Sequence, residues 1–380
     1  MNDSNTLGLY LHIPFCRSRC HYCGFYSVGQ MPTELFISAL TKEIEIKSRD
    51  FGDRVCDTLY FGGGTPSSLS IEQLEVIMKT LRKHFHISSN AEITMEMNPC
   101  DMNDEYLEET LNLGINRLSV GVQSNEDTLL KKIGRRHTAT EAEKSVKKAF
   151  KKGYKNISID LMSELPGQSA RDFRNTLKWA VHLPVTHMSV YSLILEEGTL
   201  FWQLAEKGML QRPDENESWT MYQDMCRILP HYGFERYEIS GFARKGYESK
   251  HNYKYWTLND YLGMGPAACS RIGMKRIENL PGVRLYEKEM IADQRGPSKT
   301  IVLSQEEEME EFCFLGLRMK SGIDKAAFQK RYGKNIHDIY DEVIEKLIKE
   351  KLLIETEERL FMTYKGTALG NYVFEKFILD

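Results

Sequence analysis

Three cysteines within one short segment, Cys16, Cys20 and Cys23, constrain this chain more than any other feature of its sequence. Their CxxxCxxC spacing lets one compact loop point three thiolates at a single metal centre. Iron–sulfur clusters in electron carriers normally have four cysteine ligands, and no fourth cysteine follows nearby. The spacing therefore predicts a [4Fe–4S] cluster with one iron left open to bind another molecule.

Two other interpretations of these cysteines stay open at this point. Together with His12 or His21 they would form the Cys₃His ligand set that zinc accepts. Cysteine is also an ordinary small core residue, which needs no metal at all. The ligand spacing favours the cluster over both alternatives.

The composition is that of a globular protein with a substantial core: 380 residues, 41% hydrophobic and 27% charged. Lys and Arg number 50 against 54 Asp and Glu, which gives no electrostatic footprint for nucleic acid, so none is expected as a partner. No apolar run approaches the ~18 residues of a membrane span, and the first residues lack the basic region of a secretory signal. The scattered remaining cysteines do not resemble a disulfide framework. We therefore expect a cytoplasmic protein with at most peripheral membrane contact, through its partners.

Strand-like and helical patterns alternate through the first half of the chain. Strands are predicted at 7–13, 56–61, 91–97, 117–122, 156–162 and 186–193, and helices at 33–48, from 71 and at 139–152. Repeated βα units joined by crossovers imply a parallel sheet, so the expected fold class is α/β.

Polar or glycine-rich positions stand at the ends of five predicted strands: the cysteine loop, 62–67, Glu96, Gln123 and Asp160. In parallel βα barrels the loops at the C-terminal ends of the strands build the active site. An acid inside a strand, such as Asp160, is costly to bury without a partner. Pairing with a core arginine is the structural alternative, but perturbed acids cluster at functional sites, which favours a functional role.

The second half of the chain predicts a helix at 214–231, a strand at 235–240 and an irregular region at 281–300. The tail predicts a helix starting at Ser304, a second at 335–350, a hairpin between 352 and 363, and a last helix at 366–379. Helices followed by a hairpin suggest a winged-helix-like domain. Because Lys and Arg are not concentrated there, packing or a lid role is preferred to DNA binding. We expect two domains, 1–300 with its core at 1–240, and 301–380.

One segment resembles the signature of the radical S-adenosylmethionine (SAM) group that contains the coproporphyrinogen III dehydrogenase HemN and the HemW-type haem chaperones: Tyr10-x-His12-x-Pro14-Phe15-Cys16-x₃-Cys20-x₂-Cys23. Five further motifs follow in the family's order and spacing, at 62–66, 96–99, 117–123, 134–137 and 160–167. The resemblance implies a (βα)₆ partial TIM barrel, open at one side for a bulky substrate, followed by a HemN-type C-terminal domain.

The resemblance also implies the ligands and the residues that hold them. Cys16, Cys20 and Cys23 bind the cluster, SAM binds its open iron, and one electron from the cluster cleaves SAM to a radical. The residues implied to contact this SAM are Tyr10, Gly63 and Glu96. The residues that match contacts to a second SAM in the dehydrogenase are Tyr22, Gly64, Thr65, Gln123, Arg135 and Asp160.

Two differences favour the HemW-type branch over the dehydrogenase: Phe25 stands where the dehydrogenase has a further cysteine, and only nine residues precede Tyr10. The HNxxYW segment, residues 251–256, is typical of the HemW type and implies haem contacts through His251 and Tyr255. Imidazole is a common axial haem ligand, and aromatic rings stack on a porphyrin. The alternative is an aromatic packing cluster with a hydrogen-bonded His251. Cys269 stands where the family often has a histidine, and thiolate also ligates haem.

The expected function is therefore that of a radical-SAM-type [4Fe–4S] protein that binds haem and delivers it to acceptor proteins, with an electron donor serving the cluster. A radical enzyme acting on a tetrapyrrole such as coproporphyrinogen III is the first alternative. A zinc-stabilised binding protein is the second. The sequence leaves open whether the chain is an enzyme, but efficient conversion of coproporphyrinogen III is not expected.

Overall fold

The computed structural model describes residues 6–292 and 296–379. Six strands pair in parallel, each with the next along the chain, as the sequence predicts. They are β1 (Thr6–Ile13), β2 (Val55–Gly63), β3 (His86–Met97), β4 (Arg117–Gln123), β5 (Asn156–Ser163) and β6 (His187–Ser192).

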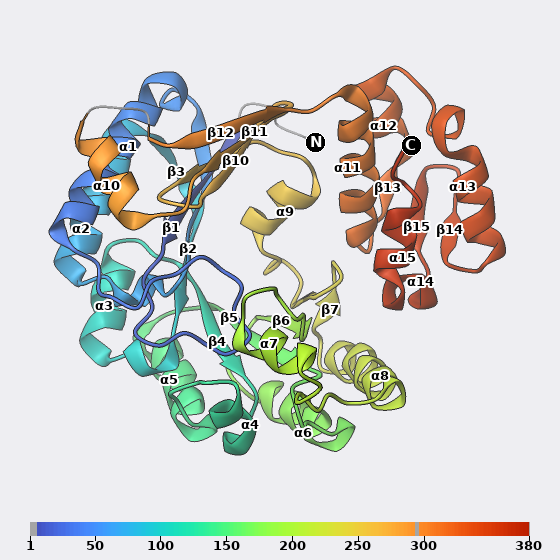
Figure 1. Cartoon of the computed structure of the whole chain (residues 1–380), viewed down its shortest axis with the longest axis horizontal. Coiled ribbons are helices and arrows are strands. Elements are labelled where there is room, and N and C mark those ends of the chain that lie inside the picture. Colours follow the sequence, from blue (N-terminus) through green and yellow to red (C-terminus); the bar gives the residue numbers. More distant parts are fainter. Residues whose placement is uncertain (1–5, 293–295, 380) are drawn as a thin grey trace.

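Helices connect these strands and cover the outer face of the curved sheet (Figure 1). They are α1 (Glu34–Phe51), α2 (Ile71–His84), α3 (Asp104–Asn112), α4 (Asp127–Lys132), α5 (Ala139–Lys152) and α6 (Ala170–Ala180), with the short 3₁₀ helices η1 (Pro66–Ser68) and η2 (Pro99–Asp101). Local sequence fixes several helix starts: Ser70 with Gln73 and Thr138 with Glu141 form capping boxes. Apolar residues from both layers form one continuous core.

The sheet extends beyond the six predicted strands at both edges. Beside β1 lie β9 (Tyr261–Met264), β10 (Cys269–Ile272), β11 (Lys275–Asn279) and β12 (Ser298–Val302); beside β6 lie β8 (Gly241–Ala243) and β7 (Glu235–Arg236). β9 runs parallel to β1, whereas the other added strands pair antiparallel. The sheet is therefore mixed, with the (βα)₆ part at its centre.

Two expectations for this region are wrong. The single strand predicted at 235–240 is interrupted, because the chain turns back after Arg236 and β8 pairs with β7. The region 281–300 is not irregular, since it holds α10 (Val283–Ile291) and β12. Pro281 and Gly282 obscure the helix in the sequence, but its apolar residues Val283, Tyr286 and Met290 are buried in the main core. Residues 293–295 of that region lie outside the described residues.

Three more helices, α7 (Leu200–Glu206), α8 (Glu215–His231) and α9 (Lys250–Trp256), follow β6. The remaining elements gather at one side of the molecule (Figure 1) around a core of their own. They are α11 (Gln305–Arg318), β13 (Ile323–Asp324), α12 (Lys325–Tyr332), α13 (His337–Lys349), β14 (Leu353–Glu355), β15 (Arg359–Met362), α14 (Tyr364–Ala368) and α15 (Gly370–Glu375). We call residues 304–379 the C-terminal unit.

The C-terminal unit contains the expected helices and hairpin, with one correction. The last predicted helix is two short helices, because Leu369 at their junction leaves the helical conformation. A buried ion pair joins the unit to the sheet: Arg271 of β10 lies 2.6 Å from Oε1 of Glu308 in α11, and Arg331 of α12 pairs with the same oxygen within the unit. A buried carboxylate needs such partners, since an unpaired one would be strongly destabilising.

In the part of the chain that the structure describes, no helix combines the length and the apolar character needed to cross a bilayer.

Candidate functional site

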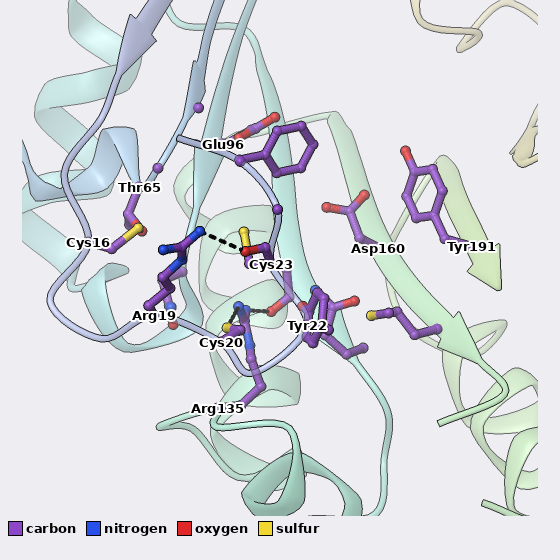
Figure 2. A pocket seen from close by; sticks show the side chains of 18 of the residues that line it. Cys16, Arg19, Cys20, Tyr22, Cys23, Thr65, Glu96, Arg135, Asp160 and Tyr191 are labelled. Atoms are coloured by element: carbon purple, nitrogen blue, oxygen red, sulfur yellow. Dashed lines mark hydrogen bonds between the residues drawn. The ribbon is translucent and has the colours of Figure 1, made fainter. Parts of the chain in front are cut away.

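A pocket of about 560 Å³ opens where the central strands end. Figure 2 shows the cysteine loop on one side of this pocket, with Glu96 and Asp160 on other strands around it. Most predicted site residues line it: Cys16, Cys20, Tyr22, Cys23, Gly63, Gly64, Thr65, Glu96, Gln123, Arg135 and Asp160. The predicted residues that do not line it are Tyr10, His251 and Tyr255.

The cysteine loop is held in place on both sides by backbone hydrogen bonds. β1 leads directly into it, and the amide of Cys16 donates to the carbonyl of Val28 at 3.0 Å. On the other side, the amide of His21 donates to the carbonyl of Ile133 at 3.1 Å. Phe15, which is fully buried, anchors the start of the loop in the core. The loop therefore keeps its three thiols at the pocket.

Polar groups surround the cysteine sulfurs. Arg135 Nη1 donates to Cys20 Sγ at 3.5 Å, and Thr65 Oγ1 lies 3.3 Å from Cys16 Sγ. Burial raises the pKa of the Cys23 thiol, and binding of a metal to that sulfur would release its proton.

The donor set fits an iron–sulfur cluster better than zinc. Among the described residues, no three His, Cys, Asp or Glu side chains come together closely enough to hold one metal ion. Zinc needs all its ligands around one ion, whereas the thiolates of a cluster bind different irons. His12 is not a spare ligand, because one ring nitrogen lies 3.1 Å from Tyr10 Oη and the other 3.0 Å from the Tyr26 carbonyl. His21 Nδ1 lies 2.9 Å from the carbonyl of Lys132.

The glycine run at the end of β2 is required by the backbone as well as by the pocket. Gly63 has φ +107°, a conformation that side chains other than glycine rarely adopt, and a Cβ there would lie 2.8 Å from the ring of His12. A Cβ on Gly64 would lie 2.8 Å from the backbone of Phe15. The run therefore lets β2 pass close to the cysteine loop and present bare backbone to the pocket.

Glu96 is a pocket carboxyl without a cationic partner. Tyr60 Oη donates to Glu96 Oε1 at 2.9 Å, and within the described chain no Lys or Arg lies within ion-pair distance of Glu96. Burial, together with the nearby Asp160, raises the pKa of Glu96 to about 7. A ligand that brings a positive charge would relieve this cost, which fits the amino group of SAM.

Asp160 is a second pocket carboxyl. Ser119 Oγ donates to Asp160 Oδ1 at 3.4 Å, and burial raises the pKa of Asp160. The structural alternative was an ion pair with a core arginine, but no described arginine lies within ion-pair distance of Asp160. Arg135, which also lines the pocket, donates instead to Cys20 and to the carbonyl of Gly121, and its buried Nε has no partner among the described residues.

Tyr10 and His251 lie behind the pocket wall rather than in it. Tyr10 stacks on Tyr60 with ring centroids 6.1 Å apart, and His251 stacks on Tyr60 at 5.2 Å. Tyr10 does not line the pocket in this structure, so its contact with SAM stays a prediction. Tyr60, which the sequence reasoning missed, links this aromatic layer to Glu96. The sequence pattern that could have identified Tyr60 is the period-two alternation of β2, which places Tyr60 and Gly62 on one face of the strand.

His251 is a hydrogen-bonded residue in an aromatic packing cluster, as the alternative interpretation of the HNxxYW segment expected. It is 1% exposed, with Nδ1 at 2.8 Å from Thr58 Oγ1 and Nε2 at 2.9 Å from Tyr255 Oη. Burial lowers the pKa of His251 to about 3, so the ring is neutral. Both ring nitrogens are engaged, so His251 would have to give up a hydrogen bond before it could ligate haem iron. Cys269 is exposed on β10 and lies outside the pocket.

The structure adds residues to the pocket that sequence reasoning did not single out, among them Ser119, Met162 and Tyr191. Each lies on a central strand. Phe25 and Ile194, which are 69% and 68% exposed, also line it and give the opening an apolar rim.

Comparison with known proteins places this site in a family. The family model described as the Radical SAM superfamily matches residues 10–180, and the HemN C-terminal domain matches residues 303–369. A protein named heme chaperone HemW from Lactococcus lactis is 39% identical over 98% of this chain and 97% of its own length. The Bacillus subtilis protein of the same name is 38% identical over 97% of this chain and 98% of its own length.

Among solved structures, coproporphyrinogen III oxidase (HemN) from Escherichia coli has a TM-score of 0.85, with 24% sequence identity over 98% of this chain and 90% of that one. This likeness confirms the radical SAM and HemN fold predicted from sequence. The superfamily implies a [4Fe–4S] cluster and SAM, for which the pocket offers three thiols and an unpaired carboxyl. The chain belongs to the radical SAM superfamily and, within it, to the HemW family.

Proposed function

We propose that this protein binds haem and delivers it to acceptor proteins, and that it keeps a radical SAM core. The observation that carries the proposal is the 39% identity, across nearly the whole chain, to a protein named heme chaperone HemW. Phe25 supports it, because this exposed side chain stands at the pocket rim where the dehydrogenase motif has a further cysteine.

The core would hold its cofactors through the residues around the pocket. Cys16, Cys20 and Cys23 bind the cluster, which supplies the electron for SAM cleavage when it is bound. Glu96 accepts the amino group of SAM, and its pKa falls when this positive charge arrives. Glycine at position 63 lets β2 pass close to His12 at a φ of +107°, which brings its backbone to the pocket.

The residues that match contacts to a second SAM line the same pocket. Gln123, Arg135 and Asp160 come from β4, the segment after α4, and β5. Tyr22, Gly64 and Thr65 line it from the cysteine loop and the end of β2. We propose that these six residues bind the part of a ligand that does not reach the cluster, whether a second SAM or the far end of the first.

Haem binding through His251 and Tyr255 stays a prediction. In its favour is the HNxxYW segment at residues 251–256. Against a direct role, His251 would give up two hydrogen bonds inside the core, each worth about 1 kcal/mol net and more if a buried partner is left unsatisfied.

The experiment that tests the proposal is a visible spectrum of anaerobically purified protein before and after haem addition, followed by transfer to a haem-free acceptor such as apomyoglobin. We expect a broad cluster absorption first, then a Soret band that moves to the acceptor. A protein that has a cluster but gives no Soret band at stoichiometric haem would contradict the chaperone function.

The alternative, decarboxylation of coproporphyrinogen III, is tested in parallel. With reductant, SAM and substrate under anaerobic conditions we expect no efficient turnover, because Phe25 replaces the additional cysteine. The fold alone does not decide this, since HemN shares it at only 24% identity. Turnover at the rate of a genuine dehydrogenase would favour the enzyme over the chaperone.

A further inference from the structure

A second pocket, of about 350 Å³, lies between the main sheet and the C-terminal unit, away from the cysteine loop. We call it the inter-unit pocket. From the main body it is lined by Cys226, Pro230, Glu235, Arg236 and Phe242; from the C-terminal unit by Leu317, Arg318, Met319, Lys320, Phe361, Met362, Tyr364 and Thr367.

The walls of the inter-unit pocket are tied together across the two units. The amide of Lys320 donates to the carbonyl of Tyr237 at 2.9 Å, and Glu238 pairs with Met319 in an isolated β-bridge. Tyr222 Oη donates to the carbonyl of Tyr364 at 3.3 Å. The pocket is therefore a built feature of the interface between the units.

Positive charge dominates the polar part of this lining. Arg236, Arg318 and Lys320 line it together with one acid, Glu235, whose carboxylate lies 3.5 Å from Lys320 Nζ. A second acid, Glu238, is not part of the lining but lies 3.9 Å from Arg318. Arg236 donates to Tyr222 Oη at 3.0 Å and to Cys226 Sγ at 3.4 Å, and no described carboxylate lies within ion-pair distance of it. A largely buried guanidinium without a carboxylate is costly, so the site is suited to an anion.

Arg318 is also incompletely paired. Its guanidinium lies 4.4 Å from the ring centroid of Trp256, and its nearest acid is Glu238, at 3.9 Å. The buried Nε of Arg318 and Oε2 of Glu238 have no hydrogen-bond partner among the described residues. Trp256 is the last residue of the HNxxYW segment, so Arg318 connects the lining of this pocket to that segment.

The rest of the lining is apolar and rich in rings and sulfur: Cys226, Phe242, Leu317, Met319, Phe361, Met362 and Tyr364. Aromatic and methionine side chains adapt to flat apolar surfaces, and sulfur atoms are among the ligands that proteins use for haem iron. An apolar wall beside three cations fits a flat apolar molecule that carries carboxylates at one edge.

We propose that the inter-unit pocket is the haem site, with the two propionates bound by Arg236, Arg318 and Lys320 and one edge of the ring against the apolar wall. The inference rests on the proposed haem-binding function and assigns the haem to one pocket. The volume is near the lower end of ligand pockets, ~300–1,000 Å³, so the pocket covers part of the haem and leaves the rest exposed. Partial burial of the haem suits a chaperone that must release it to an acceptor protein.

The test is haem titration of the full-length, cluster-loaded protein by Soret absorbance. Lys320 is 63% exposed in its side chain, so Lys320→Glu leaves the fold intact. It should weaken haem binding by about 10-fold, since 1.4 kcal/mol corresponds to a factor of ten. Arg236→Gln should weaken it by at least as much, because a hydrogen bond to a charged group is worth ~1.5–3 kcal/mol. Lys334→Glu, the same charge change at an exposed lysine outside the pocket, should leave the affinity unchanged.

A second titration uses haem dimethyl ester, which lacks the free carboxylates, so that two proteins and two ligands are compared. Wild type should bind the ester more weakly than haem, and Lys320→Glu should cause no further loss with the ester, because the interaction that it removes is already absent. Iron content and SAM affinity should match wild type in every variant.

Two results would overturn the inference. One is wild-type haem affinity in both Lys320→Glu and Arg236→Gln; the other is an equal loss with haem and with its ester in Lys320→Glu. Either result would leave the proposed function standing, with the site elsewhere. Absence of haem binding by wild type would instead contradict the proposed function, and this inference with it.

Discussion

Replacing Glu96 by glutamine should stabilise the SAM-free protein at alkaline pH while removing SAM binding. Burial, with Asp160 nearby, raises the pKa of Glu96 from 4.5 to about 7. The unfolded chain therefore releases this proton at lower pH than the folded protein does. Between these two pKa values the unfolded state binds fewer protons, so the free energy of unfolding falls as pH rises through this window and stays low above it.

The magnitude follows from the same shift. One pKa unit corresponds to 1.36 kcal/mol, so ionised Glu96 reduces the free energy of unfolding by about 3 kcal/mol above pH 7. Glutamine does not titrate and can still accept the hydrogen bond from Tyr60. The advantage of Glu96→Gln over wild type should therefore grow by about 2–3 kcal/mol between pH 5 and pH 8.

The assay is anaerobic urea unfolding of both proteins at pH 5 and pH 8 without SAM, with SAM affinity measured by calorimetry at pH 8. Glu105→Gln, at an exposed carboxylate on α3, is the matched control and should follow wild type at both pH values. A stability difference between Glu96→Gln and wild type that does not change with pH would refute the reasoning. Unchanged SAM affinity in Glu96→Gln would show that Glu96 does not bind the ligand.

Three further predictions concern the cluster, the glycine run and the HNxxYW segment. Alanine at Cys16, Cys20 or Cys23 should abolish iron binding, whereas serine at Cys56, Cys100, Cys226 or Cys313 should leave iron content intact; stoichiometric zinc in iron-free anaerobic preparations would contradict the cluster. Gly63→Val should block SAM binding with the cluster retained, because its Cβ would lie 2.8 Å from His12 at a φ of +107°; unchanged SAM affinity by calorimetry would place SAM elsewhere. His251→Ala should lower the free energy of unfolding by about 2–5 kcal/mol, since Thr58 and Tyr255 lose buried partners, and should keep the iron. The sequence predicts looser haem in that variant as well, and a Soret titration with unchanged affinity would leave His251 a core residue.

The central fold was predictable because its signals are local. Apolar strands at regular spacing and capped amphipathic helices identify βα units whichever way they later pack, and parallel pairing follows from the crossovers. The added strands at the sheet edges were not predictable, since short segments such as β9 and β10 become strands only by pairing with an edge that already exists. For the same reason α10, hidden behind Pro281 and Gly282, is evident only from the core that it completes.

The candidate site also has one part that was predictable from sequence and another part that was not. The cysteine spacing, the glycine run and the strand-end acids lie in contiguous motifs, so the sequence by itself identified the chemistry at the pocket. Only the tertiary structure decided that Tyr10 and His251 do not line the pocket, because both rings pack against Tyr60 of β2. His251 also bonds to Thr58 of β2, which lies 193 residues away along the chain. The inter-unit pocket is likewise a tertiary product: Arg236 and Lys320 belong to different units, and no local pattern reports that two distant cations share one cavity.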